Sequence, residues 1–439
     1  MNRAINAFLQ HLESMGKLEG LATDYPIMLT VYLGIFIACA IVSVMLFFSP
    51  HGNRVVWLPG QHKVIKDKFS YMAMLACTFT GVYLVGSYPS ELQNTYGTWN
   101  ADLFYTIGQT SIMLVAGIYS AATYKEKKNV VLNVLSIVIG LSTSIPLAAT
   151  SILAPLEAEG TTREIAIIAV IFTIVGLAMI SVRFNLLVKY SRINIYMFII
   201  TSVALFSTIA THDNSNVDMS KILPFQGMLD AEPWIEWFTN PYWWYFEATV
   251  VSWAVFCGRF VAYCSNGYSV KQIIKYGTFS LIVLTVIWHL VSAATGYTLS
   301  MSRGPIIYVL TGLTMLAFAV TSLDSSVKTL VDDLTRLLRN RETKSIEKSQ
   351  DNVQKKKITN IVTYVAIVTL GAINIVLLFT GFPRIFTIIG CLIFVPYFIR
   401  AISYSVRFAV GKCDYAKTGT ICETEYQEMV QNISDDTNA

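Results

Sequence analysis

The chain has 439 residues, of which 54% are hydrophobic and only 14% are charged, and its net charge is +4. Such a composition is too apolar for an ordinary soluble domain and predicts a membrane protein. The basic residues stand in short blocks between apolar runs, which argues against nucleic acid as a partner. Seven cysteines are scattered without CxxC or Cys/His spacing, so we expect free thiols and no structural metal.

Apolar stretches of about 20 residues, long enough to cross a bilayer, recur along the chain and predict about eleven helices. The spans are expected at 27–48, 68–88, 101–123, 129–152, 164–182, 192–211, 242–264, 273–297, 304–322, 358–380 and 384–407. Before the repeats, we expect an external amphipathic or disordered segment at 1–25 and an extra transmembrane helix at 26–49. A first five-helix repeat at 68–211 is followed by an external loop at 212–241 and by a second five-helix repeat at 242–408, which contains a cytoplasmic insertion at 324–357. The chain then continues as a cytoplasmic tail at 409–439, which is expected to be disordered from Cys413 onward.

Lys and Arg are concentrated in alternate loops, which predicts that those loops are cytoplasmic, with the N-terminus outside and the C-terminus inside. The helix at 68–88 then runs outward, whereas the helix at 242–264, five helices later, runs inward. The two five-helix halves are therefore expected to be inverted repeats, an arrangement that places broken helices and a binding site at the midplane of many secondary transporters.

Several stretches carry a resemblance to a known family. They are WAVFCGRFVAYCSNGYSVKQI at 253–273, FAVTSLDSS at 318–326, SPHGN at 49–53 with SYMAML at 70–75, and, more weakly, GLSTS at 140–144. Together they resemble the signature helix, the Thr-Ser-Ala-Asp-Ser motif and the first core helix of the betaine/choline/carnitine transporter family. That resemblance implies an all-α polytopic fold with the leucine-transporter-like inverted five-plus-five repeat. Family members usually have twelve helices, and the one missing here would precede the span at 27–48.

The resemblance also implies a binding site for a cation. In the family, the pair matching Thr321 and Ser322 binds Na⁺ together with backbone carbonyls that here belong to Phe318, Cys77 and Thr80. The structural alternative is that these hydroxyls bond back to carbonyls of their own helix. Because the resemblance includes this pair of hydroxyls, sodium is the expected coupling ion. Proton coupling, with Glu247 as its carrier, and exchange without an ion remain alternatives.

The substrate side matches less well. Family members hold quaternary ammonium groups in a cage of aromatic rings, which attract a cation that donates no hydrogen bonds. Only Trp253 keeps its ring on the signature helix, and cage positions on the second core helix align with Phe104, Gln109 and Ile112. The glycine-rich break in the first core helix is reduced to Gly81, flanked by Phe79 and Tyr83. The changed cage suggests a changed specificity.

Glu247 is a candidate on physical grounds, because a carboxylate inside a spanning segment is costly unless it is paired or lines water. It could pair with a substrate amine, or it could belong to an interfacial belt with Tyr242, Trp243 and Trp244 if the helix starts later. His289 is expected to be a packed histidine rather than a proton relay.

The sequence therefore predicts a secondary transporter for a small nitrogenous solute, such as betaine, choline, carnitine or a related amine or amino acid. Alternating access would rock the helices at 68–88, 101–123, 242–264 and 273–297 against the rest. The alternative is a family relative that senses or binds its solute without transporting it. No metal cluster, nucleophile motif or phosphate loop indicates an enzyme. The expected partners are the solute and membrane lipids, with a homotrimer implied by the resemblance.

Overall fold

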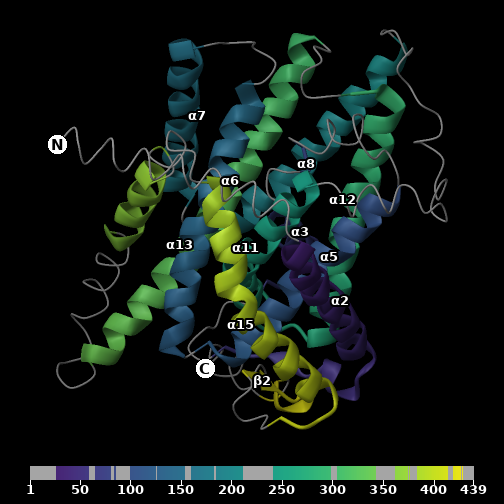
Figure 1. The fold of residues 1–439 in the computed structure, drawn as a ribbon, viewed down its shortest axis with the longest axis vertical. Coiled ribbons are helices and arrows are strands. Elements are labelled where there is room, and N and C mark those ends of the chain that lie inside the picture. Colours follow the sequence, from purple (N-terminus) through teal and green to yellow (C-terminus); the bar gives the residue numbers. More distant parts are fainter. Residues whose placement is uncertain are drawn as a thin grey trace, which may run out of the picture.

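The computed structural model describes residues 26–58, 65–80, 84–85, 99–124, 126–153, 160–181, 184–210, 241–297, 304–342, 361–373, 375, 383–413, 419–426 and 428. These residues form a bundle of helices with one short strand pair at one end (Figure 1). The helices are α2 (Pro26–Phe48), α3 (Lys68–Thr80), α5 (Trp99–Ala122), α6 (Lys127–Leu153), α7 (Gly160–Ser181), α8 (Phe184–Ser207), α11 (Pro241–Cys264), α12 (Val270–Thr295), α13 (Pro305–Glu342), α15 (Pro383–Ala409) and the short apolar helix Ile361–Ile373.

Within the described residues, seven helices are long and apolar enough to cross a membrane. Their outward faces carry large apolar side chains, for example Phe172 and Val203, which are 63% and 64% exposed. In water such faces would be unfavourable, whereas in a bilayer they contact lipid. The prediction of an all-α, multi-pass membrane protein is confirmed.

Helix pairs five elements apart run antiparallel. Tyr71 Oη and Ser265 Oγ, 2.7 Å apart, join the start of α3 to the residue after the end of α11, while the Cys257 thiol lies 3.8 Å from the Thr78 carbonyl. Along α6 and α13 the same reversal holds. Asn133 near the start of α6 bonds the C-terminal half of α13, and Ile152 near its end accepts a 3.1 Å bond from Tyr308.

The contacts between helices also repeat when the two halves are exchanged. α3 packs on α8, and α11, the counterpart of α3, packs on α15, the counterpart of α8. Likewise α3 contacts α12 and α11 contacts α5, and α6 contacts α13 across the halves. Antiparallel counterparts with matching neighbours are what an inverted repeat produces. The predicted five-plus-five arrangement, with α2 as an additional helix before it, is therefore present.

α5 and α11 approach each other closely because both have glycines at the contact. A Cβ atom on Gly117 would lie 2.7 Å from Val261, and one on Gly258 would lie 2.6 Å from Ala116. Small residues allow such close backbone packing in membranes, where apolar burial alone does not favour helix association. This pair of helices places both the substrate-side residues and the buried arginine described below.

The insertion expected from Asp324 begins differently in the structure. α13 continues unbroken from Pro305 to Glu342, and Asp324 and Asp333 within it are 3% and 0% exposed. The acidic residues that suggested the start of a cytoplasmic insertion are therefore part of a packed helix. Sequence polarity misplaces this boundary because Arg259 of α11 compensates the charge of Asp333.

The expectation that the tail is disordered from Cys413 onward is wrong where the structure describes it. Strands β1 (Val55–Val56) and β2 (Thr420–Ile421) pair antiparallel, and the Trp57 amide donates a 2.8 Å hydrogen bond to the Gly419 carbonyl. The rings of Trp57 and Tyr426 also meet, with centroids 5.5 Å apart. A loop after α2, distant in sequence, supplies the partners that the tail's composition does not reveal. The segments 1–25 and 212–240 lie outside the described residues.

Candidate functional site

The residues expected to hold a cation come from two helices that meet at a third. Cys77 and Thr80 lie near the end of α3, and Thr321 lies on α13. Asn194 of α8 stands between them, since its Nδ2 is 3.0 Å from Thr321 Oγ1 and 3.8 Å from Cys77 Sγ. The same nitrogen donates a 3.0 Å hydrogen bond to the Ala317 carbonyl. The structure therefore brings the two halves of the expected site together around one amide.

The two expected hydroxyl ligands, Thr321 and Ser322, bond to a carbonyl of their own helix in this structure. Both donate to the Phe318 carbonyl, at 2.9 and 3.0 Å. The hydroxyl of Thr80, whose backbone carbonyl is the expected ligand, donates to the Ala76 carbonyl at 2.8 Å. The back-bonding alternative is thus observed. A hydroxyl that donates in this way still has lone pairs, so its oxygen remains able to face a cation.

Asn194 is not among the residues that the sequence pointed to. It is 1% exposed, and its Oδ1 has no hydrogen-bond partner among the described residues. A polar amide within a membrane helix is a signal in itself, because polar side chains in a membrane usually bond a neighbouring helix. Its partners on α3 and α13 lie more than 110 residues away in sequence, so only the fold identifies them.

On the substrate side, Trp253 and Gln109 are occupied by contacts between helices. The Trp253 indole donates a 3.1 Å hydrogen bond to the Gly140 carbonyl on α6, and a Cβ at Gly140 would lie 2.6 Å from that ring. Gln109 donates through Nε2 to the Phe79 carbonyl, and its Oε1 has no partner in the described part of the chain. Gln109 and Phe79 are fully buried.

Other expected substrate residues are not tested by the structure. Gly81 and Tyr83 lie outside the described residues. Glu247 and Phe104 lie within α11 and α5, but their side chains are outside the description. Their roles stay predictions. His289, for which packing was expected, is fully buried on α12 beside Trp288.

Two of the motif segments act as structural anchors. Ser49 of the SPHGN motif caps a short 3-10 helix (Pro50–Asn53) and donates a 2.6 Å hydrogen bond to the Ala409 carbonyl at the end of α15. After the signature helix, Asn266 accepts a 2.9 Å bond from the Leu58 amide, and the Tyr268 and Tyr71 rings stack with centroids 3.8 Å apart. These contacts fix the end of the bundle where the loops between α2 and α3 and between α11 and α12 meet.

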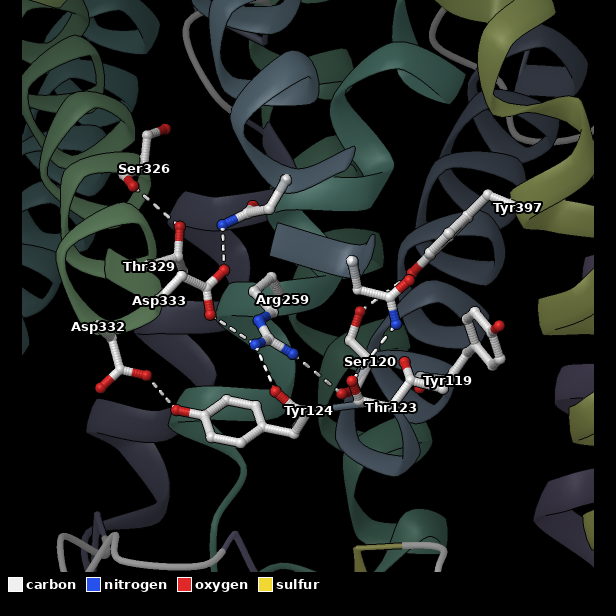
Figure 2. A network of polar contacts seen from close by, with 12 residues as sticks. Tyr119, Ser120, Thr123, Tyr124, Arg259, Ser326, Thr329, Asp332, Asp333 and Tyr397 are labelled. Carbon is white, nitrogen blue, oxygen red and sulfur yellow. Dashed lines mark hydrogen bonds and ion pairs between the residues drawn. The ribbon is translucent and has the colours of Figure 1, made fainter. Parts of the chain in front are cut away.

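A buried polar network joins four helices near that end (Figure 2). Arg259 of α11 forms a 2.5 Å ion pair with Asp333 of α13 and donates to the carbonyls of Ser120 and Tyr124, at 3.3 and 2.8 Å. Asn133 of α6 donates a 2.9 Å bond to the same carboxylate. The guanidinium carbon lies 4.2 Å from the centroid of the Tyr124 ring, whose hydroxyl donates to Asp332.

Inverted repeats of membrane helices, with polar groups gathered where the halves meet, are the arrangement of many secondary transporters. Within that class, the model of the betaine/carnitine/choline family transporters matches residues 127–306. The resemblance to this family is therefore confirmed over that region. The match supports a secondary transporter rather than an enzyme, set in a membrane with a small molecule as its solute.

No curated protein matches the chain. Among solved structures, a Na⁺-coupled sialic acid symporter in a substrate-bound, outward-open state is similar, with 12% identity over 81% of this chain and 82% of that one and a TM-score of 0.49. A manganese transporter of Eremococcus coleocola has 10% identity over 82% of this chain and 96% of its own, with a TM-score of 0.39. Both scores lie below 0.5, and the helix arrangement rests instead on the contacts described above.

Proposed function

We propose that this protein is a secondary active transporter that takes up a small nitrogenous solute by alternating access, with Na⁺ as the coupling ion. The observation that carries the proposal is the meeting of Thr321, Cys77 and Asn194 at a point shared by α13, α3 and α8. Na⁺ prefers a dry site with several oxygen ligands. Hydroxyls and carbonyls at the contact between two inverted halves supply such ligands.

In this proposal the ligands are the hydroxyl oxygens of Thr321 and Ser322 together with the carbonyls of Phe318, Cys77 and Thr80. The solute is placed nearer the middle of the bundle, with Trp253, Phe79 and Gln109 among its neighbours and Gly81, Tyr83, Phe104 and Glu247 as further candidates. The protein would sit in the cell membrane with its N-terminus outside and its C-terminus inside. Because few cage rings remain, an amine or amino acid is as good a candidate as a fully methylated ammonium compound.

The test is uptake into proteoliposomes of radiolabelled betaine, carnitine, choline and simple amino acids, with and without an inward Na⁺ gradient. We expect accumulation of at least one solute that depends on the gradient and falls at least tenfold in Thr321→Ala. Thr311→Ala is the matched control, because Thr311 is also buried on α13 and its hydrogen bonds go to the Ile307 and Tyr308 carbonyls and to Tyr297, none of which is an expected cation ligand.

Three other outcomes would change the proposal. Accumulation driven by a pH gradient and abolished in Glu247→Gln would replace Na⁺ by protons. Solute exchange without any ion gradient would remove the coupling ion. Binding without accumulation of any solute would favour the sensor alternative, in which the same fold reports the presence of its solute.

A further inference from the structure

A cavity of about 410 Å³ opens between the C-terminal end of α5 and the second half of α15. It lies outside the candidate transport site. Its polar lining comes from Tyr119, Thr123 and Glu126 on one side and from Arg400, Ser403 and Arg407 on the other. Figure 2 shows Tyr119 and Thr123 near one another at the end of α5, beside the Arg259 network but not part of its ion pair.

The cavity is positively charged. Arg400 and Arg407 are seven residues apart, or about two turns, so they lie on the same face of α15. Both are exposed, and neither forms an ion pair with any described residue. The one carboxylate in the lining, Glu126, is engaged by Lys128 at 3.0 Å. Two arginines without acidic partners beside a cavity favour an anionic ligand.

The surface around the cavity is that of a membrane protein at its lipid boundary. On α15, Ile399 is 61% exposed and Leu392 51%. These apolar side chains belong to the same helix that bears the two arginines. A ligand that fits both features has a phosphate at one end and hydrocarbon at the other. Free inorganic phosphate would use only the arginines.

We propose that this cavity binds the headgroup of an anionic phospholipid. Arg400 and Arg407 would hold the phosphate through paired N–H donors, a geometry for which guanidinium is better suited than ammonium. The Ser403 and Thr123 hydroxyls and the Tyr119 phenol line the same space and can bond the remaining headgroup oxygens or hydroxyls. Basic pockets between membrane helices on the cytoplasmic side are known to suit such headgroups, and the basic loops predict that this end is cytoplasmic.

The test uses the purified full-length protein in detergent and counts bound lipids by native mass spectrometry. The titrants are dioleoyl-phosphatidylglycerol, dioleoyl-phosphatidylcholine and inorganic phosphate. We expect saturable binding of phosphatidylglycerol, only weak binding of phosphatidylcholine, and no competition by millimolar phosphate. In Arg400→Gln/Arg407→Gln the affinity for phosphatidylglycerol should fall about thirtyfold, because each arginine is expected to contribute about fivefold and the two contributions multiply.

The control is Lys189→Gln/Arg192→Gln, which removes the same charge from exposed positions of α8 that line no described cavity. This variant should bind phosphatidylglycerol as the wild type does. The variant Arg400→Lys/Arg407→Lys keeps the charge and should bind with intermediate affinity, which also covers the case in which the glutamine variant fails to fold. An equal loss of phosphatidylglycerol affinity in the α8 control would overturn the proposal, because any exposed positive charge would then attract the lipid equally well. Full competition by phosphate would overturn the lipid assignment.

Discussion

Arg259 and Asp333 form an ion pair of 2.5 Å between α11 and α13, with side chains that are 3% and 0% exposed. The pair joins the two groups of helices that move relative to one another in the proposed alternating access, because α11 and α5 belong to the rocking group and α13 and α6 belong to the rest of the bundle. A buried pair of this kind is satisfied only while the four helices are packed as observed. Its partners on α5 and α6 accept and donate the remaining hydrogen bonds.

Removing one member of this pair should strongly destabilise the fold. In Arg259→Met the Asp333 carboxylate is left buried without its cation, at a cost of about 3–5 kcal/mol. Thermal unfolding of the purified protein in detergent measures the loss. The double variant Arg259→Met/Asp333→Leu should recover most of it, because two apolar side chains need no charge partner.

The exposed pair Lys128–Glu126 is the control for that experiment, with side chains 57% and 43% exposed. Lys128→Gln should change stability by less than about 1 kcal/mol, since solvent screens surface pairs. If Arg259→Met lowered the thermal stability as little as Lys128→Gln does, the buried pair would not stabilise the fold.

Asn194 should affect the response to Na⁺. Its N–H groups donate to the Thr321 hydroxyl and the Ala317 carbonyl, so the amide competes with a cation for the Thr321 oxygen. Losing a hydrogen bond costs about 1 kcal/mol, so Asn194→Ala should lower the Na⁺ concentration for half-maximal uptake about fivefold. A rise in that concentration would instead identify the Asn194 Oδ1 as a Na⁺ ligand.

Gly140 should not tolerate a side chain. An added Cβ would lie 2.6 Å from both the Trp253 and Phe256 rings, so Gly140→Ala should destabilise the protein by about 1–3 kcal/mol. Gly176→Ala, on α7 with no atom within 4 Å of the new Cβ, should be neutral or stabilising by up to about 1 kcal/mol. Thermal unfolding of the two variants side by side distinguishes crowding at Trp253 from a general effect of glycine replacement.

Asp67 should make stability depend on pH. It caps α3 by accepting bonds from the Ser70 hydroxyl at 2.6 Å and the Ser70 amide at 2.9 Å, and these bonds lower the pKa of its carboxyl below the ordinary value of 3.8. A lowered folded pKa means that the cap stabilises the protein fully above the unfolded pKa and is lost as pH falls through the folded one. The melting temperature of the wild type should therefore exceed that of Asp67→Ala at pH 7, and the difference should shrink below about pH 4. An unchanged difference at low pH would contradict the role of the charge.

The spans could be predicted from sequence because a bilayer imposes a length and a polarity that can be counted. α2 and α15 begin and end within two residues of the expected positions 27–48 and 384–407. The direction of each half followed from the loop charges, and the antiparallel contacts of Tyr71 with Ser265 and of Ile152 with Tyr308 agree with it. α13 extends beyond its expected end, and the charge of Asp333 in the extension is matched by Arg259 of α11, a partner that no local pattern indicates.

The sequence by itself determined the membrane class, the inverted halves and the resemblance to a transporter family, because hydropathy, loop charge and short motifs are local properties. Only the tertiary structure decided what surrounds each polar side chain. Asn194 meets Thr321 and Cys77, Arg259 meets Asp333, and Arg400 with Arg407 faces a cavity beside α5. These neighbours are mostly more than 70 residues apart along the chain, and buried polar groups derive their role from the partners that packing gives them.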